Sequence, residues 1–345
     1  GGLRIIGVAG SYGKTTMKEV LQKVLSTKYK VLSTPESVNT PVGIARFVLN
    51  KVDEQCQVLI LELGEHYRGD IKALCQIAPL DVSVITGINE AHLERLGSLD
   101  NVVATIFEAA EFGKNDALVV LNADDKLVAA NYKKFIKPTQ RMEKYQISDI
   151  QDSKFSAAGL GWTGKVNGVE VEIRLLGEYA LADASAAVTV GKHLGLSDQE
   201  ICMGLLAVRP VEHRLQPMPS AANVLVIDDS YNGNPAGAAE AVKVLERFLG
   251  RRKIYLTPGL VETGTAAPAV HREIGRRLAG VADVVILIKN SVAGYIEEGI
   301  KQQAIGNRPQ IIWFAGAPAA HEGLKDIVKS GDVVLLQNDW GDQYL

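Results

Sequence analysis

The residues best suited to chemistry form a glycine-rich loop near the start of the chain, followed at once by lysine and threonine. Residues 9–16 read AGSYGKTT and stand between an apolar run and an amphipathic stretch. Glycines let the backbone aim N–H groups at phosphate oxygens, while lysine reaches the terminal phosphates and threonine ligates Mg²⁺. Val8 replaces the first glycine of the generic motif, and an ordinary glycine-rich turn is the alternative. The pattern predicts a site for ATP and Mg²⁺ with nucleotide contacts from Gly10, Ser11, Gly13, Lys14, Thr15 and Thr16.

Other polar residues lie where they could join such a site. Glu62 ends an apolar run, so it is expected at the carboxyl edge of the sheet, where open α/β sheets bind ligands. A solvated carboxylate at a strand end is the simpler alternative. Taken by itself, His92 is more simply interpreted as a core or surface histidine that makes one hydrogen bond. The simpler interpretation of Arg214 is a charged residue on the surface. The pair at 232–233, Asn-Gly, is also consistent with a plain turn.

The elements that must position these residues alternate between short β-branched apolar runs and amphipathic helices. The strands expected in the first half are 5–9, 58–62, 82–86 and 117–122, and the helices are 15–27, 42–50 and 71–77. This alternation is typical of an open α/β sheet with parallel strands. Farther on, VNGV at 166–169 predicts a hairpin, followed by helices at 181–195 and 198–207. We therefore predict a P-loop domain with an open parallel sheet over residues 1–210.

The same alternation restarts after a proline-punctuated segment at 209–214. The strands expected there are 224–228, 253–257, 284–288, 310–314 and 333–336, with helices such as 236–249 and 270–278. We predict a second, smaller, Rossmann-like α/β domain over residues 211–345.

Composition excludes several classes of protein. A chain of 345 residues exceeds what one core usually organises, which favours two domains. With 37 Lys and Arg against 40 Asp and Glu and no basic run, we expect no nucleic-acid binding. No apolar stretch reaches the roughly 18–20 residues of a membrane span. The first apolar run leads straight into the glycine loop, so no signal peptide is expected.

The cysteines predict neither a metal site nor a disulfide framework. Cys56, Cys75 and Cys202 stand far apart and are odd in number. We expect three isolated buried thiols and a reducing, cytoplasmic location.

Four motifs in order resemble those of the Mur ligases, the ATP-dependent enzymes that build the peptide stem of peptidoglycan. TGINEAHLERLGS at 86–98 is similar to the family's NIGEAHLE.FGS, NTPVG at 39–43 to NNxxG, LELG at 61–64 to EMG, and IDDSYNGNP at 227–235 to DDSYNANP. The resemblance runs from Ile5 to about Gly341 and is nearest the branch that adds D-alanyl-D-alanine to UDP-MurNAc-tripeptide. Folylpolyglutamate synthetases share the architecture, but the last motif favours the peptidoglycan branch.

This resemblance implies an amide-bond ligase that makes an acyl phosphate from ATP and a carboxylate, which an amine then attacks. The implied catalytic residues are Lys14, Glu62, His92 and Arg214, and the metal ligands are Thr15, Glu62 and His92. Further nucleotide contacts would be Asp183, Arg214, Asp228, Tyr231 and Asn232, and substrate contacts Asn39, Thr40 and Trp340. Trp340 is equally consistent with a capping core residue. The implied partners are a UDP-sugar peptide and an amino acid or dipeptide amine, bound by a monomer.

The chain departs from the family pattern at three places. Ile106 stands where the family carries a carbamylated lysine that helps to hold a second Mg²⁺, so water replaces that ligand or the second site is weak or absent; Glu108 is a partial substitute. Asp183 replaces a nucleotide-contacting asparagine and cannot donate a hydrogen bond when ionised. QNDWGDQY at 337–344 replaces the basic KGSRGMRME.

These departures keep a second hypothesis open. The alternative is a nucleotide-binding protein of the same fold that has lost ligase activity and serves as a regulatory or scaffolding subunit. Substrate-dependent release of ADP would distinguish the two. The family's N-terminal UDP-sugar-binding domain has no counterpart in this sequence.

Overall fold

A computed structural model describes residues 2–35, 38–90, 93–220, 223–231, 233–261, 263–303 and 308–338. They form two compact units, the first comprising 1–154, 162–174 and 179–209, the second 155–161, 175–178 and 210–345. Two short segments that precede residue 210 thus belong to the second unit. Each unit contains a largely parallel sheet with helices, so the predicted α/β class is confirmed.

The first unit is built on a parallel sheet with strand order β2-β3-β1-β4-β5-β6. Its strands are β1 (Arg4–Ala9), β2 (Val31–Ser33), β3 (Val58–Glu62), β4 (Val82–Ile85), β5 (Leu118–Asn122) and β6 (Arg141–Tyr145). β3 and β4 are buried along their whole length, as continuous apolar runs in a parallel sheet should be. The chain leaves β1 toward β2 but leaves β3 toward β4. The carboxyl ends of β1 and β3 therefore form the switch point where such sheets bind ligands.

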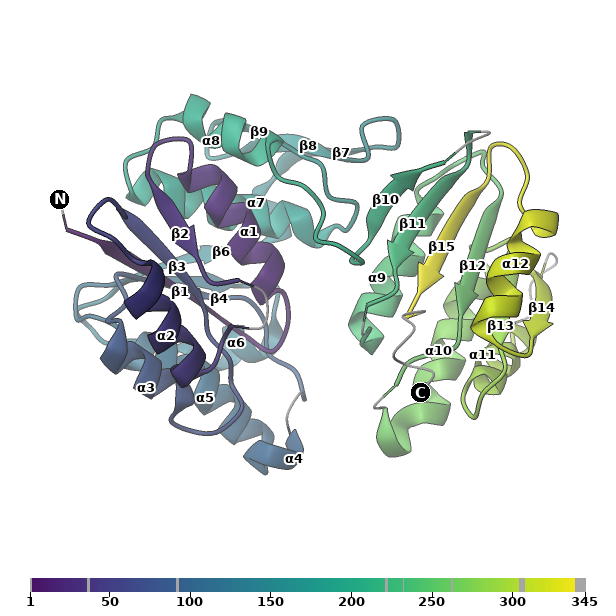
Figure 1. Cartoon of the computed structure of the whole chain (residues 1–345), viewed down its shortest axis with the longest axis horizontal. Helices are drawn as coiled ribbons and strands as arrows, with labels where there is room; N and C mark the ends of the chain where they lie inside the picture. Colours follow the sequence, from purple (N-terminus) through teal and green to yellow (C-terminus); the bar gives the residue numbers. More distant parts are fainter. Residues whose placement is uncertain are drawn as a thin grey trace. The chain divides into compact units, whose positions relative to one another are not determined.

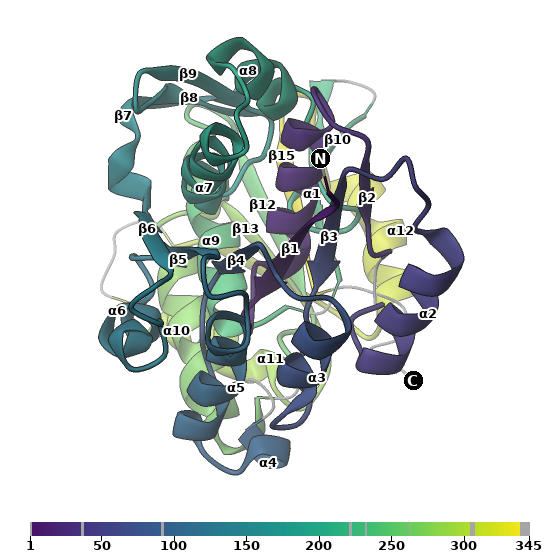
Figure 2. The same ribbon diagram turned by 90° about the vertical axis from the view of Figure 1, so that its left-hand side faces the viewer.

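Helices cover both faces of this sheet (Figure 1). They are α1 (Lys14–Leu25), α2 (Pro41–Lys51), α3 (Asp70–Ile77), α4 (Leu93–Leu96), α5 (Leu99–Glu111), α6 (Lys126–Asn131), α7 (Tyr179–His193) and α8 (Asp198–Leu206). α1 packs against α7 and α8 on one side, and α3 contacts α2 and α5 on the other, an arrangement that Figure 2 shows from a second direction. One apolar cluster of this unit joins the inner faces of α3 and α5 to the sheet.

A smaller sheet contains β7 (Gln151–Ser156), β8 (Gly161–Val166) and β9 (Val169–Ile173). The predicted hairpin is present: β8 and β9 are antiparallel, with Val166 opposite Val169. Asn167 and Gly168 between them have φ of 48° and 82°, the left-handed values that a two-residue hairpin turn requires.

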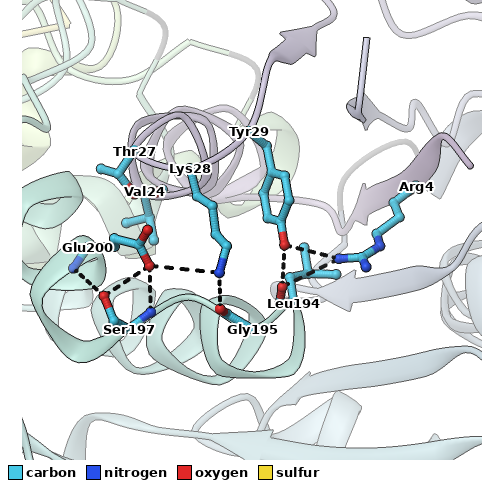
Figure 3. A network of polar contacts seen from close by, with 9 residues as sticks. All are labelled: Arg4, Val24, Thr27, Lys28, Tyr29, Leu194, Gly195, Ser197 and Glu200. Carbon is cyan, nitrogen blue, oxygen red and sulfur yellow. Dashed lines mark hydrogen bonds and ion pairs between the residues drawn. The ribbon is translucent and has the colours of Figure 1, made fainter. Parts of the chain in front are cut away.

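The end of α1 is fastened to the turn between α7 and α8 by a polar network (Figure 3). The Tyr29 hydroxyl donates to the carbonyl of Leu194 at 2.5 Å, and the Lys28 ammonium donates to that of Gly195. Gly195 has φ of 82° and closes α7 with the paired bonds Gly195 N–H to Lys192 O and Leu196 N–H to Gly191 O. The network thus holds the phosphate-loop helix against the helices that follow the hairpin.

The second unit has a sheet of order β10-β11-β15-β12-β13-β14, parallel except for the edge strand β10. Its strands are β10 (Gln216–Pro219), β11 (Leu225–Asp229), β12 (Lys253–Thr257), β13 (Val284–Ile288), β14 (Gln310–Phe314) and β15 (Val333–Gln337). Its helices are α9 (Pro235–Glu246), α10 (Ala267–Ala279), α11 (Ala293–Lys301) and α12 (Ala317–Ile327). α10 packs against α9 and α11, while α12 contacts β13 and β14.

The cysteines correct one expectation. Cys75 is buried, but Cys56 and Cys202 are only partly buried. All three carry free thiols. A search of the described helices finds none with the length and apolar character to cross a membrane.

Candidate functional site

The phosphate loop occupies the switch point at the end of β1 and requires glycine at its first bend. Gly10 has φ of 151°, and a Cβ there would lie 2.1 Å from Thr86 Oγ1 and 2.9 Å from the backbone of Gly87. Gly13, with φ of 78°, caps α1, and the Ser11 N–H donates to Gly87 O at 2.7 Å. The backbone therefore bends sharply into the helix N-terminus, where positive potential favours anions.

Lys14, the first residue of α1, is engaged on two sides. Its ammonium donates to the Gly10 carbonyl and to both oxygens of Glu65, at 3.1 and 3.0 Å. Glu65 follows β3 and is 1% exposed. The sequence predicted Lys14 but not Glu65, because nothing in the loop motif indicates which carboxylate faces it.

Thr15 and Glu62 lie together, as a shared metal site would require. The Thr15 hydroxyl donates to Glu62 Oε1 at 3.3 Å. Glu62 Oε2 lies 3.3 Å from the buried ammonium of Lys18, without hydrogen-bond geometry, and Lys18 donates to Thr34 O at 2.8 Å. A buried carboxylate oxygen that has no hydrogen bond to any described residue, and an adjacent hydroxyl, are hard oxygen donors of the kind Mg²⁺ prefers. The residues present fit a divalent cation that accompanies a nucleotide.

Asn39 and Thr40, two of the three residues expected to contact the substrate, have structural contacts as well. The Thr40 hydroxyl caps α2 by accepting the Gly43 N–H at 3.2 Å. The Asn39 carbonyl accepts the Gly64 N–H at 2.9 Å. This second bond joins the start of α2 to the end of β3, next to Glu62 and Glu65.

Asp183 lies in the first turns of α7, with its Oδ2 buried and lacking a hydrogen bond to the described residues. Burial raises the pKa of Asp183 to about 8. At neutral pH the carboxyl group is therefore protonated, and a protonated carboxyl donates a hydrogen bond. The sequence predicted an ionised Asp183 that cannot donate a hydrogen bond, and this prediction does not apply to the buried side chain.

The metal-ligand position that the resemblance placed at Ile106 is part of the apolar core. Ile106 is fully buried on α5 among the side chains that pack against the sheet. Glu108, expected as a partial substitute, instead accepts the N–H groups of Gly69 and Lys72 at the start of α3, both at 2.9 Å. Burial raises the pKa of Glu108, and these two bonds oppose the rise. Both of its oxygens are thus committed to capping a helix.

The candidate residues of the second unit lie at 213–214 and around the end of β11. His213 Nδ1 lies 2.7 Å from Asp228 Oδ2, and the other Asp228 oxygen accepts the Ser230 N–H at 3.0 Å. The Arg214 guanidinium lies 5.0 Å from the centre of the Tyr231 ring, a cation–π distance. Arg214 and Tyr231 are therefore neighbours in the fold, and Asp228 contacts His213, the residue before Arg214.

Asp229, which the sequence did not single out, is partly buried beside them. It accepts the Leu215 N–H at 3.1 Å, and burial raises its pKa to about 7, against the opposing charge of Arg214.

A second contact that the sequence did not predict holds the phosphate loop. The Tyr12 hydroxyl donates to Asp125 at 2.7 Å, and Asp125 also caps α6. Only long-range packing brings these groups together, so local spacing gave no signal for them. Three expected site residues, His92, Asn232 and Trp340, lie outside the described residues.

Comparison with known proteins assigns both units. The model of the Mur ligase middle domain matches residues 8–191, and that of the Mur ligase glutamate ligase domain matches residues 213–337. Bacillus subtilis UDP-N-acetylmuramoyl-tripeptide–D-alanyl-D-alanine ligase is 27% identical over 99% of this chain and 74% of its own length. The ligase of that name from Mycobacterium tuberculosis is 30% identical over 98% of this chain and 70% of its own.

Solved structures agree. The MurF ligase of Thermotoga maritima, in complex with ADP, superposes with a TM-score of 0.80 at 26% identity, covering 97% of this chain and 76% of that one. A MurF structure from Acinetobacter baumannii has a TM-score of 0.82 at 23% identity over 97% and 73% of the two chains. With both family models matched in order along its length, the chain belongs to the Mur ligase family.

Proposed function

We propose that this chain is an ATP-dependent amide ligase that joins D-alanyl-D-alanine to UDP-N-acetylmuramoyl-tripeptide. The observation that carries the proposal is the cluster of Lys14, Thr15 and Glu62 at the switch point of the first sheet. A family member with this cluster has the groups that phosphoryl transfer needs, and the relatives above bear the name of that reaction.

The chemistry proceeds in two steps. A carboxylate oxygen of the peptide attacks the γ-phosphorus of ATP, the bond to the β–γ bridging oxygen breaks, and ADP leaves. The amine nitrogen then attacks the acyl carbon of the acyl phosphate, phosphate leaves, and the nitrogen loses a proton. Charge develops on the phosphoryl oxygens in the first step, where the ammonium of Lys14 stabilises it.

Thr15 and Glu62, with His92, are proposed to hold Mg²⁺, which when bound supplies further positive charge against the phosphate oxygens. Asn39 and Thr40 are proposed to contact the substrate, as is Trp340. A monomeric state and a cytoplasmic location stay predictions.

The remaining nucleotide contacts are proposed from residues in both units. They are Asp183, Arg214, Asp228, Tyr231 and Asn232. Asp183 would act as a neutral donor. Arg214 supplies the permanent charge that suits phosphate oxygens.

The test is release of ADP that depends on both substrates. With UDP-N-acetylmuramoyl-tripeptide, D-alanyl-D-alanine and Mg·ATP present, ADP and the amide product are expected in equal amounts over many turnovers, and omitting either substrate stops this continuous turnover. Lys14→Ala should abolish turnover because the transferring group loses its counter-charge. Lys23→Ala, which removes an exposed lysine of the same helix, should leave turnover unchanged.

One observation favours a second candidate. Ile106 is buried in the core and offers no oxygen, so a metal ligand that the family pattern places there is missing. A chain that binds Mg·ATP but releases no ADP with either substrate would be a nucleotide-binding subunit instead of a ligase.

A further inference from the structure

The ammonium of Lys14 already has an anionic partner within the fold. Both oxygens of Glu65 lie within 3.1 Å of Lys14 Nζ, and the Lys14 side chain is 13% exposed. Glu65 stands just beyond the LELG motif, so the likeness to the family gives it no role. In the part of the chain that the structure describes, Lys14 is the polar partner of both Glu65 oxygens.

We propose that Glu65 competes with the nucleotide for Lys14 and keeps the phosphate site closed until a nucleotide displaces it. The inference rests on the proposed nucleotide site and adds a control on it. A phosphate oxygen that binds Lys14 must replace a carboxylate at hydrogen-bonding distance, so part of its binding free energy is lost to breaking that ion pair.

The charges around the loop explain why displacement is costly. Lys14, Lys18, Glu62 and Glu65 form a buried cluster with two positive and two negative groups, paired as Lys14 with Glu65 and Lys18 with Glu62. If Lys14 turns to a phosphate, Glu65 is left buried as a carboxylate without its counter-ion. An unpaired buried charge is unfavourable by far more than a surface one.

A divalent cation that arrives with the nucleotide removes this penalty. Its positive charge near Glu62 and Thr15 offsets the carboxylate that Lys14 has released. Nucleotide and cation should therefore bind cooperatively, and Glu65 should account for a large part of that cooperativity.

The experiment measures ADP affinity by calorimetry, with EDTA and with saturating Mg²⁺, for the unmodified chain, Glu65→Gln and Glu19→Gln. Glu65→Gln retains the size of the side chain but removes its charge, so affinity for metal-free ADP is expected to rise roughly tenfold, within the range of typical couplings. The ratio between the affinities with and without Mg²⁺ should fall by a similar factor. Glu19→Gln, which removes a partly exposed carboxylate 3.8 Å from Lys18 on the same helix, is the matched control and should change neither quantity.

Glu65→Asp keeps the charge but draws it back by one methylene, and an intermediate rise is expected. It decides the question if Glu65→Gln does not fold. Unchanged metal-free affinity in the folded variants would overturn the competition while leaving the nucleotide site intact. Absence of ADP binding by the unmodified chain with Mg²⁺ would instead overturn the nucleotide site, and this inference with it.

Discussion

At the scale of single residues, burial decides what several ionisable side chains can do. Asp183 is a buried carboxyl group and Asp229 a partly buried one, and their pKa values rise to about 8 and about 7. Asp229 has a backbone N–H and the charge of Arg214 to oppose that rise, whereas desolvation alone acts on Asp183. Asp183 is therefore the group whose protonation should be most visible in the stability of the fold.

We expect Asp183 to make the folded chain less stable as pH rises between about 4 and 8. In that window the unfolded chain ionises Asp183, with its ordinary pKa of 3.8, while the folded chain keeps the proton. Stability then falls by about 1.4 kcal/mol per pH unit from this group, and stops changing once both states are ionised. The Asp183→Asn variant has no proton to lose at this position. Its free energy of unfolding, relative to that of the unmodified chain, should therefore increase by roughly 2–3 kcal/mol from pH 5 to pH 7.

Urea unfolding of both chains at the two pH values measures this difference. Asp198→Asn, at an exposed position in the first turn of α8, controls for the loss of a carboxylate. A difference between Asp183→Asn and the unmodified chain that is the same at pH 5 and pH 7 would mean that Asp183 is ionised in the folded protein.

At the scale of elements, the phosphate loop depends on how α1 is held at its far end. α1 starts at the loop and ends beside the turn that closes α7, where Tyr29, Lys28 and Arg4 donate to the carbonyls of Leu194 and Gly195 (Figure 3). Carbonyls at a helix end lack partners within the helix, and cations near them are favourable. The contact therefore gives the carbonyls at the end of α7 hydrogen-bond partners and holds the end of α1 in place.

Tyr29→Phe should lower the free energy of unfolding by about 1 kcal/mol. The change removes the hydrogen bond to Leu194 O but leaves the ring, and among the described residues Arg4, at 3.4 Å, is then the side chain that still contacts this carbonyl. Denaturant unfolding measures the loss, with Tyr67→Phe, at a position 60% exposed, as the control. If both substitutions have equal effects, the bond to α7 contributes nothing measurable.

At the scale of the whole molecule, two units of the same class carry different parts of the proposed chemistry. The phosphate loop, Glu62 and Glu65 belong to the first unit, and Arg214 and Asp228 to the second. Each unit has its own sheet and helices, so a ligand that binds one of them stabilises that unit directly.

A non-hydrolysable Mg·ATP analogue at about 100 times its dissociation constant should stabilise the folded protein by roughly 2.7 kcal/mol. Calorimetric melting would show this as a higher midpoint for the transition that includes the phosphate loop. The shift should vanish in Lys14→Ala and persist in Lys23→Ala. A melting curve that the analogue leaves unchanged would speak against a nucleotide site at the loop.

The sequence by itself determined the alternation of strands and helices, the hairpin at Asn167–Gly168 and the place of the phosphate loop. These follow from local rules: buried parallel strands are apolar throughout, and tight bends need glycine. It did not reveal the edge strands β2, β6, β7 and β10. β6 is largely exposed and polar, and β10 contains prolines, which an edge strand tolerates.

Only the tertiary structure decided which charges meet and which are kept from water. Glu65 faces Lys14 because β3 lies beside β1, although 51 residues separate the two side chains. Ile106 is core and Glu108 a cap because α5 packs on the sheet and against α3. The pKa of Asp183 is raised to about 8 because its helix, α7, packs on β5 and β6 and the side chain is buried. Which charged groups pair, and how far each is removed from water, depends on contacts between segments that are distant in the sequence. These contacts arise from the packing of the whole sheet, so no local sequence pattern predicts them.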